Sequence, residues 1–450
     1  MRVAFAWIGT FLLFPLVGAP LLARPTFRRF PLGARVILSG AAGAAFVSFV
    51  MTAFALGRLR WSLPWTALAA LLLAWLLSSL LHGGITPSRP ANGRRTPAEN
   101  LAVAFSALCV LAALAATLAG AATSIDLLFF WGPKAQQFGI ARAVDVAFLA
   151  DPSHGYMHAY YPPLVVNLEA LATLAAGRFS WTAAMLTFPV LLGALALALP
   201  GVLRGVAPRP AAAAASALVV ASLAVVGIRL DVAGNGDLPL LLFETLAMAL
   251  LLRHDAAEPA VQLLAGLLLA GAAAAKVEGL AYLLAAVTLF LALEHAGPAR
   301  SARAAARLLL PSFLALATWF AFGISRDLFY EYSEYGRFLD VHFEHGAQVL
   351  TALPRALFGA GWGLPYLIPL ACVVAAGRPA HSAWLPLGTA AGLVLFLVFT
   401  YLHLADDPSD WIAWSGARVF MPVSMLLGLA FAATAGGAEA SRQAQATSPR

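Results

Sequence analysis

Long apolar runs separated by short polar segments make up most of this chain. A run of about 20 apolar residues crosses the hydrocarbon core of a bilayer, which is about 30 Å thick, as one α-helix. The pattern therefore predicts an all-α, polytopic bundle of transmembrane helices. The thirteen predicted spans are residues 3–23, 35–56, 62–82, 100–122, 182–203, 211–229, 236–253, 259–275, 278–293, 307–325, 357–377, 383–402 and 418–436.

Two other features of the apolar pattern need a separate interpretation. The run 162–178 is short, contains Glu169 and begins with two prolines, so we predict an interfacial or re-entrant helix there. The first run, 3–23, occupies the position of a secretory signal, but its apolar part is longer than in most signals and only Arg2 precedes it. We expect that run to be retained as a helix.

The composition of the chain excludes other classes of protein. Hydrophobic residues make up 61% of the chain and charged residues 11%, whereas soluble domains have about 45–50% and about 25%. This excludes an ordinary soluble protein. The net charge of +7 is spread over the ends of apolar runs, which fits the topology of a membrane protein better than nucleic-acid binding. Cys109 and Cys372 lie inside apolar runs and predict neither a disulfide nor a metal site.

Arginine-rich loops orient the predicted spans. Four of these loops fall on one side only if 162–178 does not cross the membrane, and that side is predicted to be the cytoplasm. They contain Arg24, Arg28, Arg29 and Arg35; Arg89, Arg94 and Arg95; Arg204 and Arg209; and Arg300, Arg303 and Arg307. A short disordered cytoplasmic tail is expected at 437–450. Most acidic residues then lie within helices or on the opposite face, and since acids hardly affect topology, we interpret their position as chemistry.

Three extracytoplasmic loops are long enough to form part of a site, at 123–161, 326–356 and 403–417. The loop 326–356 is rich in aromatic and charged residues and could form a lid that selects the acceptor. Its alternating charges are more typical of a solvated surface helix.

The first of these loops is predicted to contain an amphipathic juxtamembrane helix. Phe130 and Phe138 belong to its apolar face, and Lys134 to its polar face. A turn-rich piece and an aromatic cluster follow, with His158 and Tyr161 among their residues. A metal-ligand pair of His158 with the histidine four residues earlier would need a helix, and the glycine between them argues against one.

Several ionisable residues sit at the extracytoplasmic ends of spans. Asp126 follows an early span, Asp237 follows a Gly-Asn-Gly turn, Lys276 and Glu278 flank a very short hairpin, and Arg418 heads the last span. Ionisable groups at membrane depth are costly, so each is a candidate functional residue. Glu244, inside a predicted span, could face the same cleft or a neighbouring helix.

The order of these features resembles a known family. An acid after an early span is followed by W-x-x-K-A, Y-Y-P-P-L, G-x-G-D-L-P-L opening a later span, K-V-E-G at a hairpin, and an Arg before M-P. This set resembles the GT-C membrane glycosyltransferases, in particular the bacterial relatives of protein O-mannosyltransferases and lipid A aminoarabinose transferases. The resemblance covers residues 100–436, which would form the catalytic domain, and makes 1–99 an N-terminal addition of transmembrane helices.

What the resemblance implies is an enzyme of the bacterial inner membrane that uses a polyprenyl-phosphate sugar. Its sugar, a hexose or a pentose, would pass to a lipid, glycan or protein acceptor at the extracytoplasmic face. In such enzymes the acid of the first loop acts as base or helps to hold a metal, and Asp126 matches that position. The family often has a second acid directly after it, but here Leu127 follows, which argues against a two-carboxylate metal site in this loop. Asp237 would supply the second carboxylate of the pair, from the other side of the cleft. The resemblance leaves open whether a divalent metal binds, and it implies no other cofactor.

The chemistry of glycosyl transfer leads to the same residues. The reaction needs a base for the acceptor proton and cations that stabilise the departing phosphate. Asp126 and Asp237 supply carboxylates, while Lys276 and Arg418 supply cations, and arginine can bind phosphate oxygens bidentately. The predicted catalytic residues are Asp126 and Asp237, and the predicted substrate-binding residues are Lys134, His158, Tyr161, Lys276, Glu278 and Arg418.

Each assignment has a structural alternative. Asp126 could cap the surface helix, and Asp237 could cap its own span. Lys276 could simply extend to the interface. Arg418 could pair with acids of the 403–417 loop, which are Asp406, Asp407 and Asp410.

A second function class is a transporter or flippase of lipid-linked saccharides. Secondary transporters are built from internal repeats, with broken helices that meet at the midplane of the membrane. We find no convincing repeat in the sequence, and the ionisable candidates gather at one face. This favours the enzyme, and a non-catalytic assembly protein remains if the acids are structural.

Overall fold

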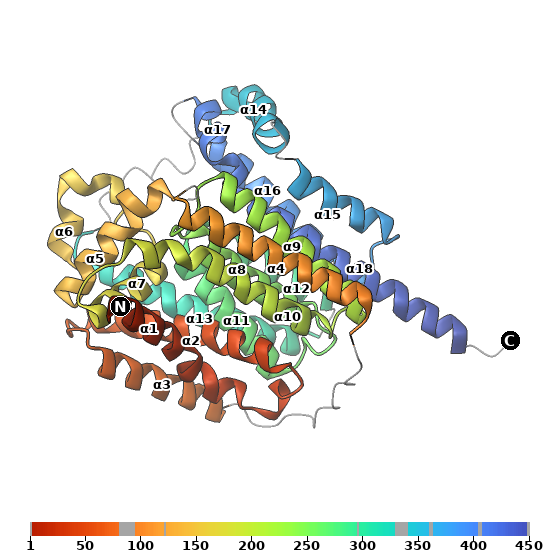
Figure 1. Cartoon of the computed structure of the whole chain (residues 1–450), viewed down its shortest axis with the longest axis horizontal. Coiled ribbons are helices and arrows are strands. Elements are labelled where there is room, and N and C mark those ends of the chain that lie inside the picture. Colours follow the sequence, from red (N-terminus) through yellow and green to blue (C-terminus); the bar gives the residue numbers. More distant parts are fainter. Residues whose placement is uncertain are drawn as a thin grey trace.

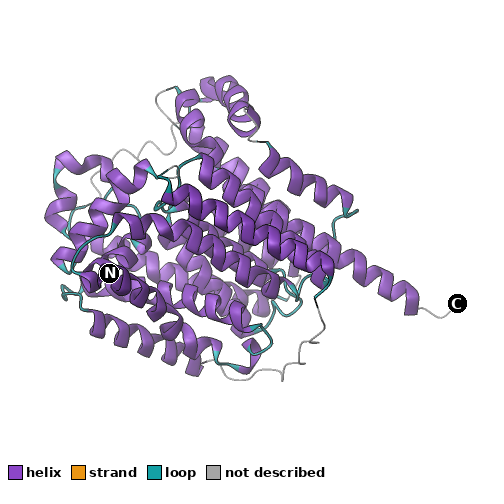
Figure 2. Cartoon of the chain, in the orientation of Figure 1, coloured by secondary structure: helices purple, strands orange, loops and turns teal. Residues whose placement is uncertain are grey.

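Figure 1 shows the computed structural model of the chain as a bundle of helices. The structure describes residues 2–80, 95–120, 123–294, 297–328, 341–359, 363–403 and 407–447. Within these ranges the regular secondary structure is helical, apart from one isolated β-bridge between Thr123 and Ala233 (Figure 2). The predicted all-α class is confirmed.

A helix lies at each of the thirteen predicted spans. They are α1 (Arg2–Leu22), α2 (Leu32–Leu56), α3 (Leu63–Leu80), α4 (Pro97–Leu118), α8 (Trp181–Leu203), α9 (Arg209–Arg229), α10 (Asp237–Leu251), α11 (Pro259–Ala275), α12 (Glu278–Glu294), α13 (Pro298–Ser325), α15 (Leu364–Ala375), α16 (Trp384–Leu402) and α18 (Met421–Thr447).

Eight helical segments in the described part of the chain are long and apolar enough to cross a membrane. They are Phe5–Leu22, Leu32–Leu56, Pro97–Leu118, Trp181–Leu203, Arg209–Arg229, Pro298–Ser325, His381–Leu402 and Pro408–Arg442. This number of apolar helices is typical of a multi-pass membrane protein. That all thirteen helices cross stays a prediction.

Five further helices lie in the connecting segments: α5 (Gly132–Ala141), α6 (Val146–Ala150), α7 (Leu164–Ala176), α14 (Gly346–Phe358) and α17 (Pro408–Val419). Helix α7 is the run that we predicted not to cross. Its 13 residues span about 20 Å at about 1.5 Å per residue, which is less than the hydrocarbon core. It is buried against α1, α2 and α5, and its depth in the membrane stays a prediction.

The arginine-rich loops gather at one end of the bundle. In Figure 1 the end of α18 projects at the right, away from α5 and α6 at the left. Arg89 and Arg94 lie outside the described residues. Contacts that join the other loops are those of Arg29 with Asp255, of Arg209 with Glu99 (2.8 Å), and of Arg253 with the carbonyl of Val202 (2.7 Å). The fourth loop follows through Arg307, which donates to the side chain of Gln262, four residues after Glu258, at 3.0 Å. The predicted common side is therefore one physical end; its identity as the cytoplasmic side stays a prediction.

The C-terminal segment differs from the prediction of disorder. Helix α18 continues to Thr447, so most of the predicted tail is helical. Alanine, glutamine, arginine and glutamate favour helix in this segment, and Glu439 pairs with Arg442 at 3.5 Å one turn later.

Helix α1 is packed closely into the bundle. Gly18 and Gly43 lie where any Cβ would collide with the backbone of the facing helix, at Ser39 and Phe14 respectively. Small residues let transmembrane helices approach this closely. That the first run is retained as a helix stays a prediction.

Candidate active site

A short contact between two distant segments positions the site. Thr123 and Ala233 form the β-bridge, which brings the start of the first large loop onto the turn before α10. Gly234 in that turn has φ +85°, a left-handed conformation that glycine adopts readily. A Cβ on Gly236 would collide with the ring of Trp131. The Gly-Asn-Gly turn therefore lets the loop approach the first residue of α10.

Five of the predicted site residues meet here in one ionic cluster, formed by Asp126, Asp237, Lys276, Glu278 and Arg418. Arg418 forms an ion pair with Asp126, and its Nε lies 3.5 Å from Oδ2 of Asp237. The Nζ of Lys276 lies 2.6 Å from Oδ1 of Asp237 and 3.1 Å from Oε1 of Glu278. Residues that the sequence places far apart thus share one site.

The ionic cluster is closed on one side and open on the other. The side chains of Asp237 and Lys276 are each 6% exposed, whereas Asp126 is 22% and Glu278 is 21% exposed. Buried charges require partners, and Asp237 has both cations beside it. A ligand would therefore meet Asp126 and Glu278 first.

Asn235 is a site residue that the sequence reasoning missed. Its side-chain amide donates to Oδ2 of Asp237 at 2.6 Å, and its Oδ1 accepts from the backbone N–H of Asp237 at 3.0 Å. The signal was available, because Asn235 is the middle residue of the Gly-Asn-Gly turn that precedes the acid. Its role is to fix the orientation of the Asp237 carboxylate.

The cluster keeps unused hydrogen-bonding capacity. Within the described residues, the buried Nε of Arg418 and Oε2 of Glu278 have no hydrogen-bond partner. Lys276 has three N–H donors and two acceptors, Asp237 and Glu278. An anion that reached the cluster would find donors on both cations.

The geometry does not support the alternative in which the two aspartates only cap helices. Asp126 precedes a π-helical turn at Leu127–Trp131, but its side chain makes no capping hydrogen bond. Asp237 lies in the first turn of α10, where helix-dipole stabilisation of a negative charge is available. Its carboxylate bonds to Lys276 and Asn235. Lys276 does not extend to the interface, because it is buried in this pair.

Arg418 occupies a different position from the predicted one. It lies in the last turn of α17, and the helical structure is interrupted at Phe420 before α18 begins. Pro422 lacks the N–H that would bond to the carbonyl four residues earlier, which favours the break. Among the described residues, the acids that pair with Arg418 are Asp126 and Asp237. Asp407 accepts from the backbone N–H of Ser409 at 2.8 Å, and Asp406 lies outside the described residues.

Helix α14 supports α17. The two helices lie side by side at the top of Figure 1 and share a small apolar core that includes Val349 and Ile412. The indole of Trp414 lies 5.1 Å from the guanidinium carbon of Arg418. Residues 329–340 of the proposed lid, with four of its charged residues, lie outside the described part. In the described part, 341–359, the segment supports the helix that carries Arg418.

Lys134, His158 and Tyr161 lie beside the ionic cluster rather than in it. Lys134 is buried, donates to the carbonyl of Met157 at 2.8 Å and lies 3.5 Å from the centre of the Phe130 ring. Tyr161 packs against His158 and Phe130 at 5.6 Å and 5.2 Å between ring centres. These contacts hold the first loop together, and a substrate-binding role for the three residues stays a prediction.

Glu244 faces the interior of the bundle. The hydroxyl of Tyr282 donates to its backbone carbonyl at 3.0 Å, which places it against α12. Both of its carboxyl oxygens are buried without a hydrogen-bond partner in the described part of the chain.

The arrangement does not fit a metal site. Arg418 already lies between the carboxylates of Asp126 and Asp237, where a shared metal would have to bind. Among the described residues no group of three or more His, Cys, Asp or Glu side chains could hold a metal ion. His154, from the predicted histidine pair, bonds through Nδ1 to the carbonyl of Phe148 at 2.9 Å.

The residues, rather than known relatives, are the basis for assigning a function. No family model, curated protein or solved structure matches this chain.

Proposed function

We propose that the chain is a membrane glycosyltransferase that moves a sugar from a polyprenyl-phosphate donor to an acceptor at the extracytoplasmic face of a bacterial inner membrane. The observation that supports it most is the ionic cluster, in which two aspartates from distant segments are joined by Arg418 and faced by Lys276. The GT-C-like order of motifs supports the same assignment.

The proposed reaction needs one base and one anion site. An acceptor hydroxyl attacks the anomeric carbon, the carbon–oxygen bond to phosphate breaks, and polyprenyl phosphate leaves. Asp126 takes the proton of the hydroxyl, since it is the more exposed of the two aspartates (22% against 6%). Arg418 and Lys276 bind the phosphate oxygens. Asp237 holds both cations in place.

Charge balance suggests how the donor enters. The cluster has three carboxylates, Asp126, Asp237 and Glu278, and two cations, so its formal net charge is −1. A phosphodiester adds another negative charge and competes with Asp126 for Arg418. Donor binding would then release Asp126 from its ion pair and leave its carboxylate oxygens free to accept the proton of the acceptor hydroxyl. The resting ion pair keeps the base inactive until the donor is bound.

The test is transfer by purified protein in lipid vesicles with labelled polyprenyl-phosphate hexose and pentose donors. Asp126→Asn should lower transfer at least about 100-fold, as expected for loss of a general base, while membrane insertion is kept. Asp231→Asn is the matched control. Asp231 is exposed and lies outside the cluster, and its backbone has a left-handed conformation (φ +51°). Asparagine tolerates that conformation well.

Three results would contradict the proposal. Full activity of Asp126→Asn would exclude it as the base. Absence of cleavage with every donor would exclude the transferase. Movement of intact lipid-linked sugar across the vesicle membrane, without cleavage of the phosphate link, would establish the transporter instead.

A further inference from the structure

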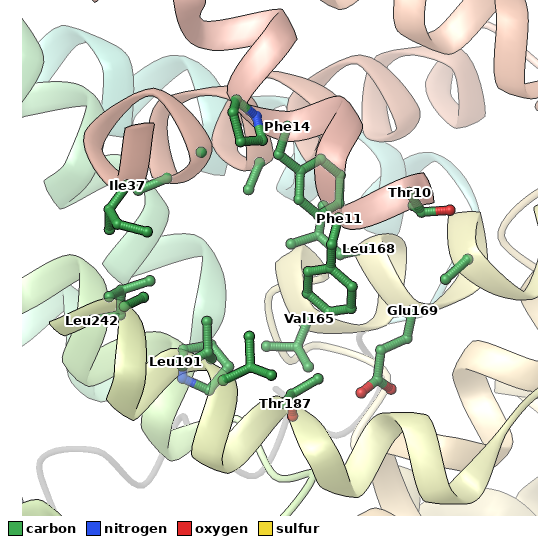
Figure 3. Close-up of a pocket in the computed structure, with 18 of the residues that line it drawn as sticks. Thr10, Phe11, Phe14, Ile37, Val165, Leu168, Glu169, Thr187, Leu191 and Leu242 are labelled. Carbon is green, nitrogen blue, oxygen red and sulfur yellow. The ribbon is translucent and has the colours of Figure 1, made fainter. Parts of the chain in front are cut away.

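An apolar cavity of about 310 Å³ lies between α1, α2, α7, α8 and α10 (Figure 3). Its volume is at the lower end of the range for small-molecule sites, about 300–1,000 Å³, so it accommodates one chain rather than a whole lipid. Side chains that form its wall include Phe11, Phe14, Ile37, Val165, Leu191 and Leu242.

The cavity opens sideways from the bundle. Leu12, Val36 and Val190 belong to its lining and are 62%, 42% and 54% exposed. They come from three different helices, α1, α2 and α8. In a multi-pass membrane protein such exposed apolar side chains face lipid, so a lipid chain can enter laterally from the bilayer.

Two buried polar side chains in the lining each keep an atom that makes no hydrogen bond in the part of the chain that the structure describes. Trp7 is 2% exposed and Glu169 is 6% exposed. Neither Nε1 of Trp7 nor Oε2 of Glu169 makes a hydrogen bond within the described residues, and Figure 3 shows Glu169 reaching from α7 at the edge of the cavity. An indole N–H only donates, whereas a carboxyl group that is buried without a cation favours its neutral form, which both donates and accepts. A hydroxyl or an amide would satisfy both.

The cavity also borders the ionic cluster. Asn235 belongs to its lining, and the amide of Asn235 donates to Asp237 at 2.6 Å. Pro239, in the first turn of α10, lines the cavity as well. A chain bound here would therefore have one end close to Asp237.

We propose that this cavity binds the apolar chain of a lipid acceptor, and that a hydroxyl or amide group of that lipid pairs with Trp7 and Glu169. The proposal rests on the proposed transferase function, and it names the acceptor class that function leaves open. A polyprenyl chain has no hydrogen-bonding group, so it would leave both polar atoms unsatisfied, which is unfavourable. The unpartnered pair thus favours the acceptor lipid over the donor as occupant.

A second cavity supplies an internal control. It has about 280 Å³ and lies between α2, α3, α7, α11 and α13. Its polar lining groups are partnered: Arg307 bonds to Gln262 at 3.0 Å, and Thr52 donates to the carbonyl of Ser48 at 3.0 Å. Such a site suits any hydrocarbon chain and needs no polar group on it.

The experiment uses the full chain in lipid vesicles with two photoactivatable lipids of equal chain length. One carries an amide at the start of its chain, and the other carries an ether in its place. We expect the amide lipid to label the peptides of α7 and α8 at least about tenfold more than the ether lipid. Leu168→Trp, which fills this cavity, should abolish the labelling, whereas Leu263→Trp, which fills the second cavity, should not change it.

The polar contact is tested at Glu169. Glu169→Leu should lower labelling by the amide lipid about tenfold, and Glu169→Gln, which still donates and accepts, should retain most of it. Equal labelling by the two lipids, or labelling that survives Leu168→Trp, would overturn the proposal.

Binding and transfer fail in different ways. Asp126→Asn should bind the amide lipid like the wild type, since this readout does not need turnover. Labelling as expected, with no sugar transferred to any lipid, protein or glycan, would refute the transferase and leave the lipid site standing. Transfer to a protein or glycan that Leu168→Trp leaves intact would refute the lipid acceptor and leave the transferase standing.

Discussion

The ion pair between Lys276 and Asp237 can be measured by a double-mutant cycle of Asp237→Asn and Lys276→Met. In each single variant a charged group stays buried without its main partner. Removal of one partner from a buried pair costs about 3–5 kcal/mol. Lys276 would keep Glu278 at 3.1 Å, and Asp237 would keep Arg418 at 3.5 Å and Asn235 at 2.6 Å. We therefore expect each single variant to lose about 3 kcal/mol of unfolding free energy, the lower end of that range.

The double variant should cost far less than the sum. With both groups neutral, no charge is left uncompensated between these two positions, and the loss should be about 3–4 kcal/mol rather than about 6. The coupling free energy is then about 2–3 kcal/mol, in the range measured for residues in direct contact.

Reversible unfolding of the purified protein in mixed micelles gives these free energies. A matched control combines Asp237→Asn with Arg209→Gln, at the opposite end of the bundle, where the effects should add within about 0.5 kcal/mol. If the losses of unfolding free energy in the Lys276 and Asp237 variants also added within about 0.5 kcal/mol, the two side chains would not be in contact. The ionic cluster would then have to be abandoned.

Three shorter predictions address the site and the opposite end. Arg418→Lys keeps the charge but loses the planar guanidinium that reaches two carboxylates, so transfer should fall at least about tenfold with insertion unchanged. Asn235→Ala frees one oxygen of Asp237 and should cost about 1–2 kcal/mol of unfolding free energy, measured in the same micelles. Burial opposes ionisation of Asp255, but the hydrogen bonds and charge of Arg253 outweigh it and lower the pKa of Asp255. The folded state then binds fewer protons than the unfolded state, so from about pH 5 downward the wild type should lose more stability than Asp255→Asn.

Apolar periodicity was enough to place the helices, because a span must satisfy every backbone group internally and so has to be a helix. It was not enough at the C-terminus, where α18 continues through polar residues to Thr447. There the helix depends on intrinsic propensity and on the pair between Glu439 and Arg442, both of which an apolar pattern overlooks.

The sequence pointed to the members of the ionic cluster but not to their pairing. Arg418 has acids within a few residues on its own loop, and local pairing with them was the structural alternative. Asp407 instead accepts from the backbone at the start of α17, and Arg418 reaches Asp126, 292 residues away in sequence. Such a choice depends on how α17 packs on α14 and α16, which the order of residues does not reveal.

Ion pairs by themselves do not distinguish a catalytic site from a structural one, because both ends of this bundle contain them. At the arginine-rich end, Arg209 meets Glu99 and Arg253 meets Asp255 at 2.8 Å each; the first pair joins two loops, and the second lies within one loop. Neither arginine lines one of the two described cavities. The ionic cluster differs in that Asn235 joins it to a cavity that opens toward lipid. An enzyme that acts on lipid substrates needs its charged groups next to such a cavity, so this adjacency, rather than the charges, is the strongest argument for catalysis at this end.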